Sequence, residues 1–322
     1  MGIFSLRAGQ AGLGDQAGEP GSPLPLSSSP RLQAESLAAR MPAMVLAAER
    51  VAATVAHGAH GRRRPGGGES FWQYRPYQAG DPPARIDWRQ AGRSDALLIR
   101  QQEWDAAQTL WIWRDGSPSM AWSSWPGHYP EKQERAEVLA LALTLLLLRG
   151  GERVATLEPP LPPQHGVAAL ERVALALLAT PTQGCPPPQG VARHGAVALL
   201  GDWLDPPETL GQRLAQWQKQ EIRGCLVQIR DPAESDLPYD GRVRFQGAEG
   251  ETAVTIPEVP AVRAAYRQRL AAHDDALATL CRMAGWGLIR HRTDQPPQAA
   301  LLTLYQALTR GSGAGAPACG RG

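Results

Sequence analysis

Apolar residues follow two alternating patterns through the second half of the chain. Short, continuously apolar runs such as TLWIW, AVALL and CLVQI are typical of strands buried on both faces of a sheet. They are separated by longer stretches in which Leu, Ala and Trp recur at helical spacing. The predicted strands cover 109–113, 153–157, 196–200, 225–229 and 287–289, and the predicted helices cover 131–149, 167–178, 207–220, 261–284 and 297–308. This alternation predicts an α/β fold with a doubly wound, mainly parallel sheet.

The part of the chain before this region has a different pattern. Residues 31–108 predict an Ala-rich helix over 32–57, interrupted near Pro42. A small β-rich N-terminal extension follows, which mixes aromatic residues with Pro and Gly turns and contains the expected strand ALLIRQ. The α/β domain itself is expected to cover 109–310.

The two ends of the chain lack any periodic pattern. Residues 1–30 and 311–322 are rich in Gly, Pro and Ser, and we expect a disordered leader and a disordered tail. Because nothing before them predicts folded structure, Met41 and Met44 are alternatives to Met1 as the start of the protein.

Composition narrows the classes of function. The 322 residues carry 33 Lys and Arg against 31 Asp and Glu, a formal charge of +2 that gives no general attraction for nucleic acid. The longest apolar stretch, 138–148, is shorter than the roughly 20 residues that a membrane helix needs. Four cysteines lie far apart without a CxxC pair, which predicts free thiols and a cytoplasmic protein.

Two loops stand out because they follow buried strands. Ligands of a doubly wound sheet gather beyond the carboxyl ends of its strands. The first long strand is followed there by Asp115, Ser117 and Ser119 in the sequence DGSPS, and a later strand is followed by Asp202. One carboxylate and two hydroxyls can converge on one point, and Asp202 can reach the same ion directly or through a water. These hard oxygen ligands suit Mg²⁺ or Mn²⁺.

Each candidate also has a simpler structural interpretation. Asp, Gly, Ser and Pro favour turns for backbone reasons alone, and an isolated Asp202 could be a helix N-cap. The run Arg62-Arg63-Arg64 is expected to be a solvated loop, in preference to a phosphate contact. Trp203 is either a packing residue or an exposed anchor for a partner. Arg75 and Tyr77 belong to an aromatic cluster that either pins the β-rich extension or forms a partner surface.

The chain lacks common catalytic signatures. Neither of the two lysines, Lys132 and Lys219, lies in a GxxxxGK[ST] phosphate-binding loop. GxSxG and HExxH are absent as well. We therefore expect a protein that is not an enzyme, while a hydrolase that uses two carboxylates stays open.

The two loops and several other segments resemble those of known protein families. The DGSPS loop, the later GD and the βα alternation resemble von Willebrand factor A domains with a metal-ion-dependent adhesion site. The segments FWQYRPYQAGDPPARIDW, ALLIRQ, RDPAESDLPY and AAYRQRLAAHDDALATLCRMAG resemble the bacterial family called domain of unknown function 58, from about 32 to 310. Members are similar to von Willebrand A proteins encoded beside MoxR-type AAA+ ATPases.

The resemblance implies a function and exposes two departures. It implies a non-catalytic, metal-dependent adaptor that works with a MoxR-like AAA+ ATPase and a client protein in protein maturation or complex assembly. The alternative is a metal-dependent hydrolase using Asp115 and Asp202. Nucleic-acid binding and direct membrane insertion are not expected.

Such adhesion sites usually add a Thr from a third loop, which neither Thr180 nor Thr182 clearly supplies. Arg114 stands where an apolar residue is usual, and would either weaken metal binding or contact a partner.

Overall fold

A computed structural model of the chain describes residues 6–8, 30–59, 71–77, 86, 88, 97–102, 108–179, 184–248 and 252–309. The described strands are β1 (Leu6–Ala8), β2 (Phe71–Pro76), β3 (Leu98–Gln102), β4 (Thr109–Arg114), β5 (Arg153–Thr156), β6 (Leu161–Gln164), β7 (Ala196–Gly201), β8 (Arg223–Arg230), β9 (Val243–Gly247), β10 (Val254–Ile256) and β11 (Gly287–Arg292). The described helices are α1 (Pro30–Ala59), α3 (Lys132–Arg149), α4 (Leu170–Ala179), α5 (Pro207–Lys219), α6 (Pro232–Asp236), α7 (Val259–Ala284) and α8 (Gln298–Thr309).

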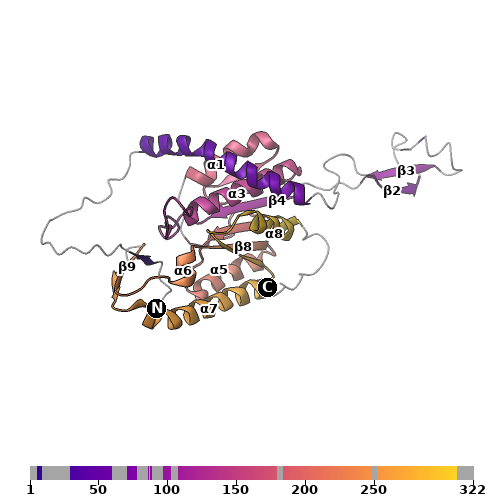
Figure 1. Cartoon of the computed structure of the whole chain (residues 1–322). Helices are drawn as coiled ribbons and strands as arrows, with labels where there is room; N and C mark the ends of the chain where they lie inside the picture. The colour runs from indigo at the N-terminus through magenta and orange to yellow at the C-terminus, as the bar shows by residue number, and fades with distance from the viewer. Residues whose placement is uncertain are drawn as a thin grey trace.

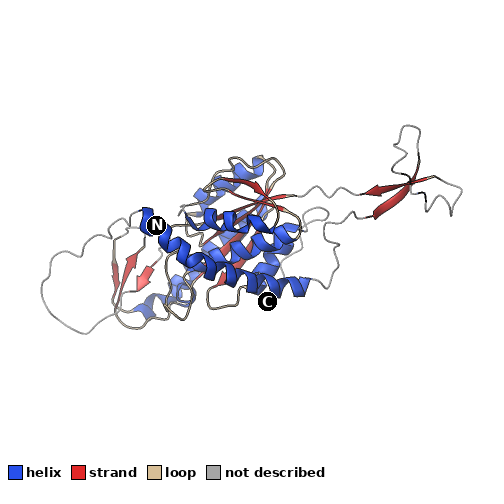
Figure 2. Ribbon diagram, turned by 90° about the horizontal axis from the view of Figure 1, so that it is seen from above, coloured by secondary structure: helices blue, strands red, loops and turns tan. Residues whose placement is uncertain are grey.

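A six-stranded sheet forms the centre of the molecule (Figures 1 and 2). Its strand order is β11-β8-β7-β4-β5-β6, and every neighbouring pair is parallel except β5 with β6. From β4 the chain builds outward to β5 and β6, and it then returns to the other side of β4 with β7. The predicted mainly parallel α/β sheet is therefore confirmed. The strand order reverses between β4 and β7.

Helices cover both faces of this sheet. On one face α1, α3, α4 and α8 pack their apolar side chains against Leu110, Ile112, Ala198 and Leu200. On the other face α5 and α7 pack against Trp113, Val197, Leu199 and Leu226. The two sets alternate along β4 and β7, because successive side chains of a strand point to opposite faces.

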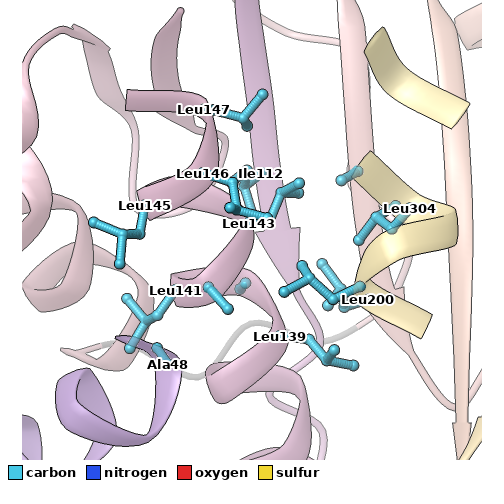
Figure 3. Close-up of a cluster of buried hydrophobic side chains, with 14 of the residues drawn as sticks. Ala48, Ile112, Leu139, Leu141, Leu143, Leu145, Leu146, Leu147, Leu200 and Leu304 are labelled. Atoms are coloured by element: carbon cyan, nitrogen blue, oxygen red, sulfur yellow. The ribbon is translucent and has the colours of Figure 1, made fainter. Parts of the chain in front are cut away.

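The helix α3 is apolar on nearly all sides. Leu139, Leu141, Leu143 and Leu145 have no exposed surface, because α3 lies between the sheet and the other helices of its face (Figure 3). A helix that is apolar all round needs this central position. Among the described residues, no helix is both long enough and apolar enough to span a membrane.

Several features differ from the predicted elements. The helix α1 continues through Pro42 without the expected interruption, and its Met44, Ala48 and Val51 are buried in the apolar cluster with α3. This packing compensates for the cost of an internal proline. Within the leader expected to be disordered, β1 pairs with β9 in a separate sheet with β10. The strand β6 and the short helix α6 were not predicted, since neither has an apolar repeat.

The expected β-rich extension consists of one antiparallel pair among the described residues. The predicted strand ALLIRQ corresponds to β3, which pairs with β2 in a two-stranded sheet separate from the central one. Cys185, Cys225 and Cys281 are buried free thiols, as expected, and Cys319 lies outside the described residues.

Candidate functional site

The four predicted ligand residues lie where the strand order reverses. The strands β4 and β7 are parallel neighbours, so their carboxyl ends reach the same edge of the sheet. Asp115 follows β4 and Asp202 follows β7. The backbone N–H of Asp115 donates to the carbonyl of Leu200 at 2.7 Å, which keeps the two chain segments paired one residue beyond β4. Such a reversal opens a place for ligands in doubly wound sheets.

A glycine lets the two loops approach closely. A Cβ atom added at Gly201 would lie 3.1 Å from the Cβ atom of Asp115 and 3.4 Å from its Oδ2. The hydrogen side chain therefore keeps room for the Asp115 carboxyl group. Two residues later, Trp203 has a positive φ of 56°, a conformation that costs a non-glycine residue free energy. Its indole Nε1 donates to the carbonyl of Val227 at 3.0 Å, which stabilises this turn beside Asp202.

The oxygen atoms of the two loops form one chain of hydrogen bonds. Ser117 donates its backbone N–H to Asp115 Oδ1 at 2.9 Å. The Oγ atoms of Ser117 and Ser119 are 2.8 Å apart, and Ser119 Oγ donates to Asp202 Oδ2 at 2.7 Å. All four residues are buried, with exposed fractions between 3% and 7%. The structure thus brings together residues that are 83 positions apart in sequence.

Two further residues, which sequence analysis did not identify, complete this arrangement. Lys132 is the first residue of α3 and has no exposed surface. Its Nζ donates to Asp202 Oδ2 at 2.9 Å and to Glu234 Oε1, on α6, at 2.5 Å. We call Asp115, Ser117, Ser119, Lys132, Asp202 and Glu234 the polar cluster. One signal for Lys132 was present in the sequence, because it is one of only two lysines among 33 basic residues.

The charges of the polar cluster are unbalanced. Burial raises the pKa of Asp115 to about 7, the negative charge of Asp202 adds to this, and the hydrogen bonds from Ser117 oppose it. Burial also raises the pKa of Glu234, although Lys132 lowers it. Burial alone would lower the pKa of Lys132, but Asp202 and Glu234 together raise it above its usual value. Two carboxyl groups, those of Asp202 and Glu234, therefore contact one ammonium group, so Lys132 can neutralise only one of them.

One distance within the polar cluster is compatible with a small divalent cation. Two adjacent ligands of an octahedral Mg²⁺ ion lie about 2.9 Å apart, and the two serine Oγ atoms are 2.8 Å apart. Asp115 adds a carboxylate, and Asp202 accepts a hydrogen bond from the hydroxyl of Ser119. No group of three or more His, Cys, Asp or Glu suited to a metal occurs among the described residues, so such an ion would depend on the hydroxyls. Thr180 and Thr182 lie outside the described residues.

Arg114 and Trp203 do not form the expected partner surface. The exposed fraction of each is 3%. Arg114 donates to the carbonyl of Leu177 at 2.6 Å and pairs with Glu137 at 3.4 Å, beneath the apolar helices. The ring of Trp203 packs against Trp113, with 5.9 Å between centroids. Both side chains are therefore buried in this structure, and of the two interpretations of Trp203 the packing one agrees with its position.

The other candidates lie outside the polar cluster. Tyr77 is half-buried, and its backbone N–H donates to the carbonyl of Leu97 at 2.8 Å beside the β2–β3 pair. The side chain of Arg75 and the run Arg62-Arg63-Arg64 lie outside the described residues. The partner role of Arg75 and Tyr77 stays a prediction.

Comparison with solved structures gives weak matches. The chain matches the crystal structure of the conserved hypothetical protein BatB from Bacteroides thetaiotaomicron with 14% identity and a TM-score of 0.39. This match covers 63% of the chain and 98% of that structure. An aerotolerance-related membrane protein from Bacteroides fragilis gives 14% identity and a TM-score of 0.36, over 63% of the chain and 100% of that structure.

Sequence comparison gives a clearer result. The chain is 27% identical over 299 residues to Uncharacterized protein Rv1480 of Mycobacterium tuberculosis and to Uncharacterized protein Mb1516 of Mycobacterium bovis. The aligned region covers 87% of this chain and 92% of each relative. The family model described as Protein of unknown function DUF58 matches residues 73–276, a span that includes the whole polar cluster. The chain therefore belongs to the DUF58 family.

Proposed function

We propose that the protein is a non-catalytic interaction module that uses a divalent cation at the polar cluster to bind an acidic side chain of a partner protein. The observation that carries the proposal is the 2.7 Å hydrogen bond from Ser119 Oγ to Asp202 Oδ2. This bond joins the loops of two neighbouring parallel strands at the reversal of strand order. It links a hydroxyl of the first loop directly to the carboxyl group of the second.

Each residue has a distinct part in the proposed site. Asp115, Ser117 and Ser119 would hold the ion, with Mg²⁺ or Mn²⁺ as the candidates, and Asp202 would orient the hydroxyl of Ser119. A cation held directly by one carboxylate and two hydroxyls keeps coordination positions that no protein group fills. A carboxylate from a partner is a hard oxygen ligand that can fill one of them. The proposal thus explains why serines, which cannot neutralise an ion, stand at this edge of the sheet.

The resemblance to von Willebrand factor A domains supports an adaptor role. We infer that the partner is a MoxR-like AAA+ ATPase, that a client protein is bound as well, and that the complex serves protein maturation or complex assembly. The three buried free thiols suit a reducing compartment, so we place the protein in the cytoplasm.

The test is capture of the purified MoxR-like ATPase on the immobilised full chain. We expect capture in Mg²⁺, loss of capture in EDTA, and at least a tenfold loss for Asp115→Ala, because that variant lacks the charged ligand. Asp275→Asn is the matched control, since Asp275 lies on the exposed face of α7. Capture by Asp115→Ala in EDTA that equals the wild type in Mg²⁺ would refute the proposal.

A second candidate function has one observation in its favour. Asp115 and Asp202 are two buried carboxyl groups at the same edge of the sheet, the pair that a two-carboxylate hydrolase needs. A metal-dependent hydrolase using Asp115 and Asp202 would then show turnover of phosphoesters in Mg²⁺ or Mn²⁺. Turnover that disappears in Asp115→Asn would favour the hydrolase, and its absence across a broad ester panel would favour the interaction module.

A further inference from the structure

We propose that Lys132 is a built-in counter-cation that keeps the polar cluster assembled without a metal and lowers the affinity of the site for a divalent cation. This inference rests on the proposed cation site. In this proposal the positive charge of Lys132 sets the affinity of the site for a divalent cation, a role that none of the expected ligand residues has. It also predicts that the ammonium group and a bound ion compete for the same negative charge.

The position of Lys132 is unusual for a lysine. Lysine side chains are almost never fully buried, because removing the ammonium group from water is costly. Here the cost is offset by two carboxylates, at 2.9 Å and 2.5 Å from Nζ. Backbone bonds hold the base of the side chain, since the N–H of Lys132 donates to the carbonyl of Trp122 at 3.2 Å. The ammonium group is thus fixed in place.

Lys132 and the proposed ion would share one carboxylate. Asp202 Oδ2 accepts from Lys132 Nζ and also from Ser119 Oγ, at 2.9 Å and 2.7 Å. The ammonium group therefore lies one hydrogen-bonded atom away from a serine that would bind the ion. Two cations this close repel each other strongly at the low polarity of a buried site. Removal of the positive charge should strengthen cation binding.

Arg114 does not take the place of Lys132. Its guanidinium group bonds to the carbonyl of Leu177 on α4, pairs with Glu137 on α3 and makes a 3.4 Å bond to the backbone carbonyl of Asp115, and none of these contacts involves the Asp202 carboxyl group. The charge that touches Asp202 in the structure is that of Lys132. Lys132 also ties the loop after β7 to α6 through Glu234. It consequently joins α3, the β7 loop and α6 even when no ion is bound.

The experiment measures Mn²⁺ affinity by electron paramagnetic resonance titration of the full chain. Four variants accompany the wild type: Lys132→Met, Glu234→Gln, the double variant Lys132→Met/Glu234→Gln, and Lys219→Met. Methionine has a similar length without charge. If Lys132→Met alone does not fold, the double variant still allows the comparison. It leaves only the carboxylate of Asp202 without its ammonium partner, because Glu234 has been replaced by a neutral side chain. Lys219→Met removes the other lysine of the chain, an exposed residue in the last turn of α5.

We expect the double variant to bind Mn²⁺ at least roughly tenfold more tightly than Glu234→Gln, from the loss of one nearby positive charge. Lys219→Met should match the wild type. Equal or weaker binding in the double variant would overturn the inference while leaving the proposed cation site intact. If the wild type binds no Mn²⁺ but the Lys132-free variants do, the inference holds and metal-dependent capture by the natural protein fails. If no variant binds Mn²⁺, both fail.

Discussion

The middle of α3 and the polar cluster are equally buried for opposite reasons. Leu139, Leu141, Leu143 and Leu145 have no exposed surface and gain stability from every contact they make. Asp115, Lys132 and Asp202 are between 0% and 7% exposed, and their burial costs free energy that only hydrogen bonds and opposite charges offset. The two regions meet within one element, since Lys132 begins the helix that Leu139–145 continues.

The difference in energetic cost separates the middle of α3, which stabilises the fold, from the polar cluster, where we propose that a ligand binds. An apolar helix would stabilise the sheet without any acidic neighbour. The polar cluster contributes little net stability, because buried ion pairs seldom repay the loss of hydration. Lys132 can neutralise only one of the two carboxyl groups that it contacts, Asp202 and Glu234. The proposed binding function would use the remaining carboxyl group.

The largest effect on stability should come from Lys132→Met. The change leaves Asp202 and Glu234 buried without their partner, and we expect a loss of about 3–5 kcal/mol in the free energy of unfolding. Urea unfolding in EDTA measures it, with Lys219→Met as the control. Saturating Mn²⁺ should restore part of the loss, because the ion supplies the missing positive charge. A loss below about 1 kcal/mol would mean that the cluster is hydrated after all.

A similar or slightly smaller loss should follow from Leu143→Ala. Removal of this fully buried side chain leaves a cavity between α3 and the sheet, at a cost of about 2–5 kcal/mol. The matched control is Leu175→Ala on α4, whose side chain is 44% exposed and whose loss should change stability by about 0.5 kcal/mol or less. Unlike the loss in Lys132→Met, this one should not respond to Mn²⁺. A response to Mn²⁺ would remove the distinction between the two regions.

His291 should make stability depend on pH. Burial lowers its pKa from 6.5 to about 4, the charge of Arg135 lowers it further, and Asp294 opposes both. Its Nε2 has no hydrogen-bond partner among the described residues. The unfolded chain therefore takes up the proton first, so stability present above pH 6.5 is lost as the pH falls toward 4. The loss should approach about 3 kcal/mol.

Urea unfolding from pH 7 to pH 4 tests this expectation. Asp115, whose pKa is raised in the folded state, contributes with the opposite sign over the same pH range, so the variants are compared with the wild type at each pH. Relative to the wild type, His291→Gln should become more stable as the pH falls, whereas His128→Gln, at an exposed histidine, should match the wild type throughout. Identical slopes in the wild type and His291→Gln would show that His291 is already hydrated in the folded state.

The smallest effect should have the opposite sign. Asp115→Asn removes a buried negative charge near Asp202 while its amide oxygen can still accept from the N–H of Ser117. In EDTA at neutral pH we expect a gain of about 1 kcal/mol, the exchange of function for stability that is common at binding sites. Differential scanning calorimetry with and without Mn²⁺ should show stabilisation by the ion in the wild type alone. A loss of stability in EDTA would place Asp115 among the structural residues.

Much of the fold was determined by the sequence alone. The apolar runs of β4, β7 and β8 and the helical spacing of α3, α5 and α7 are local patterns, and each specifies its element without reference to the others. The short polar elements β6 and α6 were missed because they carry no apolar repeat. The helix interruption predicted near Pro42 was wrong, because packing of α1 against α3 outweighs the tendency of proline to break a helix.

The site also contains residues that the sequence predicted and residues that it did not. Position after a buried strand identified Asp115, Ser117, Ser119 and Asp202, because all parallel strands of a sheet end at one edge. Lys132 and Glu234 could not be identified, since the contact between α3 and α6 depends on how α6 folds back after β8, over a separation of 102 residues. Strand ends are encoded locally, whereas the partner of a buried charge is chosen only when distant elements pack together.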